Sequence, residues 1–520
     1  MTYYGYPLLI ALGFGSGLLL LGLSSWIRSS VLRKLLVAAA LTCLPLAWLL
    51  HAMTGRMVLS AWSPSSVLDG WIVLAIDRPI FGVVLLTGAV LAAAAWLLVS
   101  ERGSVVSLAG VLGILLWSVV WLCLASGSVL TLLVTWTVFD AIWFLGQLID
   151  RAEGEKALWA VSVNGATTVL LWALSLFLAR RGTSGFWWLM QPSSRMVELL
   201  LLAVGMRLGF YPFHVGRAEG PGQSRLLALA GLLQPATGMA LLYRILLLPG
   251  ELTPPTWFLV WGGVSAMWLA IKATGVEASR ARYVAGYALF LLAATGATAL
   301  EDPGSLLLSH SVWLAGMALV TMERPSNAAV YPLRWPTLWG ILLLIGAPFS
   351  PLSRVVSLPV VEGIWWLWGI AGVTLALAWA AMLTSVRSAS PGDGRPPWPH
   401  LWFPLIAGVF ILILAPCVAA WWGMGVLPIR GYVPLAVWMT GVVAGTLLAG
   451  WGRGMLEGVH RAALLIDLLD LQWLYRVLWN GTQNMLSVFR AVGDVMEGSG
   501  SVLWSVLILL LIWMVARGFS

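Results

Sequence analysis

Four ionisable side chains fall within long apolar stretches of this sequence, where charge is costly. They are Asp140, Arg207, His310 and Arg354. An ionisable group inside a membrane span costs about 2.5–3.5 kcal/mol on insertion scales, so such groups are candidates for function. A carboxylate and an imidazole can each accept and release a proton, and a nearby cation influences which form the carboxylate takes. These residue types therefore point to proton transfer through an apolar interior.

Each of the four residues also has a purely structural interpretation. Asp140 could neutralise a buried arginine for stability alone, and Arg207 could extend its side chain towards a membrane surface. His310 could be a hydrogen-bonded packing residue, and Arg354 could reach a lipid headgroup. The residue types alone leave transport and stabilisation open.

The composition of the chain places these residues in a membrane protein. Of its 520 residues, 60% are hydrophobic and 10% are charged. Soluble domains carry about 25% charged residues, so this chain could not cover a water-facing surface. The composition also excludes disorder and a disulfide scaffold. Nucleic-acid binding is excluded because the charges behind the net +8 lie singly in short loops, with no basic stripe. Cys43, Cys123 and Cys417 lie far apart and show no metal-ligand spacing.

The apolar stretches predict an all-α polytopic membrane protein with about sixteen transmembrane helices, since one span needs about 20 apolar residues. The predicted spans are 6–27, 33–53, 79–99, 105–125, 128–149, 157–179, 195–214, 224–246, 256–275, 282–300, 304–322, 336–360, 364–385, 402–422, 432–451 and 500–518. The loops between them are too short for a soluble domain. Lys and Arg are more frequent on one set of alternating loops, which predicts that the N-terminus lies outside.

The segment 453–496 has a different pattern. Its polar residues recur close to every 3.6 positions, with Leu, Trp, Val and Ile between them. This spacing predicts an amphipathic helix that lies at a surface and does not cross the bilayer. An ordinary interfacial helix and a brace along neighbouring spans both fit the pattern.

Two of the predicted spans are interrupted by proline. Pro212 lies in the first, and Pro348 and Pro351 lie in the second. Proline removes an N–H group and clashes with the preceding turn, so we expect both helices to break at these positions. Paired interrupted helices are typical of transporters built from two inverted repeats. A single proline, by contrast, is often a simple kink.

The stretch after Arg207, LGFYPFHVGRAEGPGQSRLLALAGLL, carries a specific motif. It resembles K-S-A-x-x-P-F-H-x-W-L-x-x-A-x-E-G-P-T-P-V-S-A-L, which marks the antiporter-like, proton-translocating membrane subunits of respiratory complex I. The same family includes subunits of multisubunit cation/proton antiporters, membrane-bound hydrogenases and inorganic-carbon transporters. Weaker matches are GWIVLAIDRPIFGVVLL, SGSVLTLLVTWTVFDAIW, LSHSVWLAGMALV and GAPFSPLSR.

The resemblance implies an organisation for the whole chain. It predicts spans 1 to 3 in 1–100, a first antiporter-like repeat in 101–250, a second in 251–390, spans 14 and 15 in 391–452, a lateral helix in 453–499 and a final span in 500–520. Each repeat contains one broken helix, and the two repeats are inverted relative to each other. The resemblance also implies the plasma membrane of a bacterium or an archaeon.

The chain departs from the family at the first proton-carrying pair. In the family a Glu of span 5 pairs with a Lys of span 7. Alignment on Trp136 places Thr137 at the Glu position, with Asp140 one helical turn further on, and Arg207 at the Lys position. Asp140 could therefore substitute for the Glu. Arginine does not release its proton in practice, whereas a buried lysine can.

The second half of the chain departs in the same way. It keeps His310 but has Leu314 at the position of the relay lysine. The lysine expected past the second break falls near Val356, and Arg354 is the nearest cation. The scaffold of the family is therefore expected, and its lysine relay is not.

Three functions remain open. The first is proton or cation/proton translocation through Asp140, Arg207, His310 and Arg354, as a membrane subunit of a complex I-like or antiporter-like assembly. The second is a non-pumping structural subunit that anchors a catalytic partner, and the third is a membrane subunit of an inorganic-carbon uptake complex. No nucleotide, flavin, haem or iron–sulfur motif occurs, so we expect no cofactor, and any redox chemistry would belong to partners. The expected partners are other membrane subunits, a soluble catalytic protein and lipid, but no nucleic acid.

Overall fold

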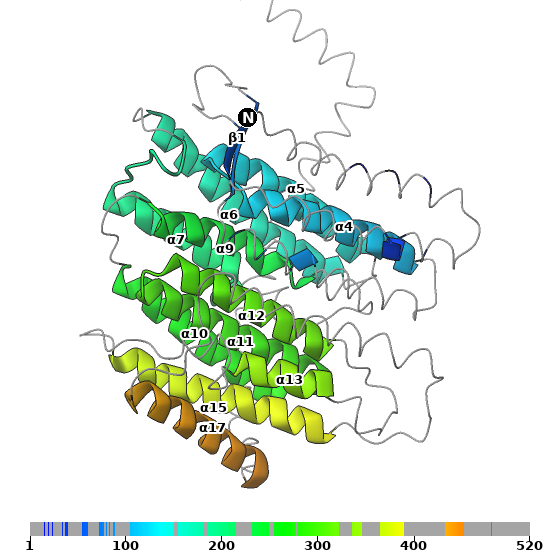
Figure 1. Cartoon of the computed structure of the whole chain (residues 1–520), viewed down its shortest axis with the longest axis vertical. Helices are drawn as coiled ribbons and strands as arrows, with labels where there is room; N and C mark the ends of the chain where they lie inside the picture. Colours follow the sequence, from blue (N-terminus) through cyan, green and yellow to red (C-terminus); the bar gives the residue numbers. More distant parts are fainter. Residues whose placement is uncertain are drawn as a thin grey trace, which may run out of the picture. The chain divides into compact units, whose positions relative to one another are not determined.

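The structure is a computed structural model of the chain (Figure 1). It describes residues 55–60, 72–76, 105–149, 154–180, 185–214, 231–248, 254–276, 278–321, 335–345, 365–388 and 432–451, together with single residues before 89 and Asn480. The chain divides into two compact units, Met1–Arg461 and Ala462–Ser520. Apart from Asn480, all the described residues lie in the first unit.

Helices make up most of the described residues. They are α4 (Val105–Leu124), α5 (Val129–Ile149), α6 (Gly154–Arg180), α7 (Ser194–Leu208), α9 (Gln234–Leu246), α10 (Thr256–Gly275), α11 (Ala278–Ala299), α12 (Pro303–Thr321), α13 (Trp335–Leu344), α15 (Trp365–Ser388) and α17 (Tyr432–Trp451). Most bounds lie within a few residues of the predicted spans. Helix α7 is different, because it ends at Leu208, whereas the apolar stretch predicted a span that continues to 214.

Five described segments are long and apolar enough to cross a membrane. They are Val129–Gln147, Ala160–Leu178, Thr256–Gly275, Pro303–Thr321 and Trp366–Ser385. The described part is thus mostly helical and has the character of a multi-pass membrane protein, as predicted. The count of about sixteen spans and the inverted repeats stay predictions. Outside the described residues, wholly or mainly, lie the predicted spans 6–27, 33–53, 79–99, 336–360, 402–422 and 500–518 and the lateral segment 453–496.

A β-hairpin corrects the prediction of an all-α protein. Strands β1 (Gly55–Ser60) and β2 (Ile72–Ile76) pair antiparallel. The hairpin docks on the turn between α4 and α5, where the Ala75 N–H donates to the Ala125 carbonyl over 2.7 Å and the Gly127 N–H donates to the Val73 carbonyl over 2.7 Å. The sequence predicts a loop here, between the spans 33–53 and 79–99, because the apolar run is too short for a span and the hydrogen-bond partners of the hairpin lie about 50 residues away.

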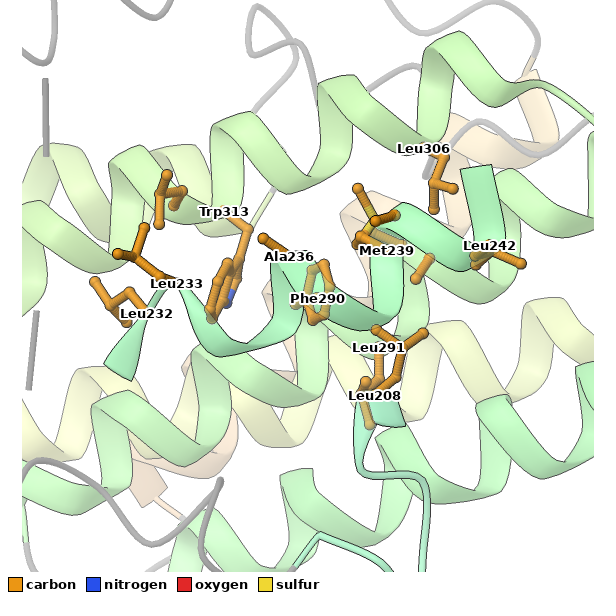
Figure 2. Packing of buried hydrophobic residues seen from close by; sticks show 14 of the residues in the cluster. Leu208, Leu232, Leu233, Ala236, Met239, Leu242, Phe290, Leu291, Leu306 and Trp313 are labelled. Carbon is orange, nitrogen blue, oxygen red and sulfur yellow. The ribbon is translucent and has the colours of Figure 1, made fainter. Parts of the chain in front are cut away.

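Helix α9 lies at the centre of the described helices. It packs against α4, α7 and α12, and every residue from Gln234 to Ile245 is buried. Figure 2 shows Ala236 and Met239 of α9 close to Phe290 of α11 and Trp313 of α12. Polar side chains on α9 must therefore find their partners within the protein.

Helices that follow one another in the sequence also pack against one another. Helix α5 lies between α4 and α6, and α6 also contacts α7. Further along the chain, α10 packs against α7, α11 and α15, and α17 packs against α15. In Figure 1 the helices from α4 to α9 lie alongside one another. Helices α5, α6, α7 and α9 together supply the side chains of the candidate site.

Candidate functional site

Asp140 of α5 and Arg207 of α7 form a buried ion pair. The Arg207 Nη1 donates a hydrogen bond to Asp140 Oδ2 over 2.8 Å, and Arg207 Nη2 lies 2.8 Å from Asp140 Oδ1. Asp140 is 8% exposed and Arg207 is fully buried. A guanidinium that meets a carboxylate through two parallel contacts has the geometry of a strong, charge-assisted pair.

The guanidinium of Arg207 is also held by α9 and by aromatic rings of α5. Its Nε donates to the hydroxyl of Thr237 over 2.9 Å, and the hydroxyl of Thr237 donates in turn to the Gln234 carbonyl over 2.8 Å. The guanidinium carbon lies 4.6 Å from the centre of the Trp136 ring and 5.9 Å from that of Phe139. Aromatic faces attract a cation, most strongly where water is excluded.

The carboxylate of Asp140 has further donors on α6. Asn164 Nδ2 donates to Asp140 Oδ1 over 3.1 Å, and the Thr168 hydroxyl donates to Oδ2 over 3.5 Å. Asn164 is fully buried. A buried ion pair is stable only when its remaining lone pairs and protons also find partners. Here α6 supplies donors to the Asp140 carboxylate, and α9 supplies an acceptor for Arg207.

Substitution of Thr237 tests how much its hydrogen bond to Arg207 stabilises the protein. We expect Thr237→Val, which keeps the shape of the side chain, to lower the free energy of unfolding by about 1–3 kcal/mol, because it removes the hydroxyl that accepts from the buried Arg207. Thermal unfolding in detergent measures the change. Thr237→Ser keeps the hydroxyl and serves as the control. Equal stability of the Val variant and the wild type would contradict the importance of this hydrogen bond.

Thr137, which the alignment on Trp136 predicts at the position of the family Glu, does not take part in this network. Its side chain is exposed and its hydroxyl donates to the Leu133 carbonyl of its own helix over 3.0 Å. Asp140, one turn later, is buried and meets Arg207. The acidic side chain that meets α7 therefore lies one helical turn after Thr137 on α5.

His310 of α12 is buried among aromatic rings. Its ring centre lies 5.7 Å from that of Phe290 and 5.7 Å from that of Trp313. Within the described part of the chain, neither ring nitrogen has a hydrogen-bond partner, so His310 is not hydrogen-bonded to the Asp140–Arg207 pair. The predicted pathway residue Arg354 and the predicted helix breaks Pro348 and Pro351 lie outside the described residues.

Helix α7 ends four residues before Pro212. Gly209 has a left-handed backbone with a φ of 74°, and its N–H donates to carbonyls of the last turn. The peptide bond between Tyr211 and Pro212 is cis. A left-handed residue directly after a helix is a common way to end it, and glycine adopts this conformation without steric cost. The chain therefore leaves the axis of α7 directly after the turn that carries Arg207.

Side chains from two other helices bind the backbone groups at this break. The Tyr211 N–H donates to the Ser265 hydroxyl over 2.9 Å, and the Trp261 indole N–H donates to the Tyr211 carbonyl over 2.5 Å. The Tyr287 hydroxyl donates to the Leu208 carbonyl over 2.7 Å. Backbone groups freed at membrane depth need such partners, so α10 and α11 stabilise the broken conformation.

Sequence reasoning missed several residues of this region. Asn164 and Thr237 were not singled out, although an Asn in the middle of an apolar span is a usable signal. Lys272 falls within the predicted span 256–275 but was not singled out either; it lies in the last turn of α10, and its Nζ is 3.5 Å from His214 Nε2. Among the residues that the structure describes, no three His, Cys, Asp or Glu side chains are grouped to hold a metal ion.

The fold of this chain is shared by chains of two known membrane complexes. One belongs to the membrane-bound sulfane sulfur reductase, an archaeal respiratory membrane complex, with a TM-score of 0.69 and 14% identity over 98% of this chain and 99% of that one. The other belongs to the Mrp complex from Dietzia sp. DQ12-45-1b, with a TM-score of 0.69 and 16% identity over 99% of this chain and 62% of that one. The predicted resemblance is thus confirmed at the level of the fold. No protein-family model and no characterised protein matches the sequence.

Proposed function

We propose that this chain is a membrane subunit of a multisubunit, complex I-like or antiporter-like assembly, and that it takes part in the transfer of protons, or of cations in exchange for protons. The observation that carries the proposal is the buried Asp140–Arg207 pair, which joins α5 to α7 next to the break in α7. The shared fold supports the role as a subunit, because both similar chains belong to membrane complexes.

Asp140 is the member of the pair that can change its charge. Arginine keeps its proton under physiological conditions, so only the carboxylate can become neutral. Asp140 would then keep its contacts to Asn164 and Thr168 on α6, and Arg207 would keep Thr237 and the Trp136 ring. Asp140 and Arg207 therefore each keep interactions of their own when the contact between them breaks.

In this proposal His310 and Arg354 continue the pathway, with water between them and the pair. We expect His310→Phe to keep or raise thermal stability, because an apolar ring replaces two buried nitrogens without described hydrogen-bond partners. The same variant should reduce proton flux by about tenfold or more, since a positioned proton carrier contributes at least that much. A stable variant with wild-type flux in reconstituted vesicles would remove His310 from the pathway.

The proposal as a whole is tested by reconstitution of the intact assembly. A tag on this chain allows purification from native membranes in mild detergent, and the assembly is then inserted into lipid vesicles with an internal pH-sensitive dye. We expect an imposed pH difference to decay faster than in empty vesicles, with or without added Na⁺ or K⁺. Decay no faster than in empty vesicles, under both conditions, would contradict translocation.

A non-pumping structural subunit is the second candidate. The observation that favours it is the set of hydrogen bonds around the ion pair, which would hold α5, α6, α7 and α9 together without any transport. The proteins that co-purify decide which assembly is present. Redox subunits would indicate a respiratory or hydrogenase complex, antiporter-type subunits a cation exchanger, and a zinc-binding soluble protein inorganic-carbon uptake.

A further inference from the structure

One face of α10 lines the chain segment that follows the break in α7. The face consists of Trp261, Ser265, Trp268 and Lys272. Their spacing of four, three and four residues places them on the same side of a helix. The first two bind the backbone of Tyr211 through hydrogen bonds, and the ring of Trp268 lies 5.0 Å from the Tyr211 ring.

The last member of this face, Lys272, meets His214. The two side-chain nitrogens, Nζ and Nε2, are 3.5 Å apart. The Tyr211 ring stacks on the imidazole, with 5.8 Å between ring centres and 21° between planes. The imidazole is thereby held between an aromatic ring and an ammonium group, and its position depends on the same face of α10 that binds the break.

Burial changes sharply across the two residues. His214 is 1% exposed, whereas Lys272 is half-buried in the last turn of α10. The C-terminal end of a helix favours a cation, so a protonated Lys272 is well placed there. The sequence predicts that this end of α10 faces the cytoplasm. The pair therefore connects a partly accessible amine with a buried imidazole.

The chemistry of the two groups differs from that of the Asp140–Arg207 pair. Only three lysines occur in the whole chain, namely Lys34, Lys156 and Lys272. Lysine can give up its proton in a partly buried site and arginine cannot. Arg280 and Arg282 lie at the start of α11, which packs against α10, and both keep their protons. A proton that Lys272 releases has an acceptor at hydrogen-bonding distance in neutral His214, and two adjacent positive charges are disfavoured.

We propose that Lys272 and His214 form a proton-transfer pair, through which protons pass between the aqueous edge of α10 and the protein interior beside the break in α7. The proton moves from the Lys272 ammonium to the His214 Nε2 and leaves a neutral amine. His214 then releases this proton to water on the interior side, and only afterwards does the Lys272 amine take up the next proton from water at the aqueous edge. The opposite order of steps carries protons outward. This inference rests on the proposed function, because it assigns a site to the transfer of protons. In this proposal Lys272 gains and loses the proton, and not Arg207, which the alignment places at the position of the family lysine.

A substitution series at Lys272 separates proton transfer from a fixed charge. In the reconstituted intact assembly, we expect Lys272→Arg and Lys272→Gln to reduce proton flux by about tenfold or more. Lys272→His, which restores a titratable base, should retain more flux than Lys272→Arg. His214→Gln should lose flux as well. Lys156→Arg, a lysine substitution in the first turn of α6, is the matched control and should keep wild-type flux.

Flux is normalised to the amount of assembled chain, and thermal unfolding is measured for each variant. Wild-type flux in Lys272→Arg would show that a positive charge is sufficient and would overturn the proton-transfer pair alone, with the proposed function intact. Equal losses in the His and Arg variants at equal assembly would also overturn it. A wild-type assembly without any flux would instead overturn the proposed function, and this inference with it.

Discussion

Asp140→Asn is expected to lower the free energy of unfolding by about 3–5 kcal/mol, because breaking a buried ion pair on one side leaves an uncompensated charge. Arg207 is fully buried, and its guanidinium meets the carboxylate through both terminal nitrogens. The amide of Asn cannot balance this charge. The loss should appear as a lower midpoint of thermal unfolding in detergent, at equal expression.

The double variant Asp140→Leu with Arg207→Met should recover more than half of that loss. Apolar residues of similar volume often replace a buried ion pair at no net cost or with a gain of about 1–4 kcal/mol. Recovery is not expected to be complete, because Asn164 and Thr237 lose their partners. If the double variant is less stable than Asp140→Asn, the cost of the unpaired charge is not the cause of the single variant's instability.

The same two variants distinguish transport from stabilisation. In reconstituted vesicles both should lack proton flux if Asp140 carries protons, although the double variant is assembled and stable. A stable double variant with wild-type flux would leave the pair with a structural role only. Stability alone cannot make this distinction, since both functions need the fold.

The helices, and Asp140 and Arg207 as candidate residues, could be predicted from the sequence because their signals are strong, whereas the contact between the two side chains could not. An apolar run of about 20 residues has few alternatives to a membrane helix, and α10 begins and ends as predicted. Asp140 and Arg207 stood out because charge is rare inside such runs. These signals depend only on residue type and position along the chain, so no tertiary information was required.

The partners of the pair could not be predicted in the same way. Thr and Asn occur on many apolar helices, and only packing decides which of them face a charge. Thr237 binds Arg207 because α9 is buried between α4, α7 and α12. The contact of Lys272 with His214 was missed for a related reason. Lys272 lies near the end of the predicted span 256–275, and only packing shows that its side chain meets His214 of the segment after α7.

The end of α7 shows a limit of local rules. Proline at 212 predicted a break, but the helix already ends at Leu208, where Gly209 takes a left-handed conformation. The conformation is stabilised by Ser265, Trp261 and Tyr287, which lie 50 or more residues away in sequence. Such partners come from tertiary packing, so the sequence near the proline does not indicate them.

Gly205 is the residue whose replacement should disturb this region most. It lies one turn before the end of α7, and a Cβ atom there would overlap the six-membered ring of Trp261 on α10. We expect Gly205→Ala to lower the free energy of unfolding by about 1–3 kcal/mol, the usual cost of an overfilled core. Proton flux should also fall, because Trp261 holds the Tyr211 carbonyl and Arg207 lies two residues beyond Gly205.

Gly165 of α6 provides a matched control, because a Cβ atom there meets nothing within 4 Å. Gly165→Ala should leave flux unchanged and raise stability by about 0.5–1 kcal/mol, since alanine favours a helix over glycine. Full stability in Gly205→Ala alone would mean that α7 and α10 can separate at no cost, and the broken segment would then need support from elsewhere. If the two glycine variants differ as expected, the close approach of α7 and α10 stabilises the helix that carries Arg207.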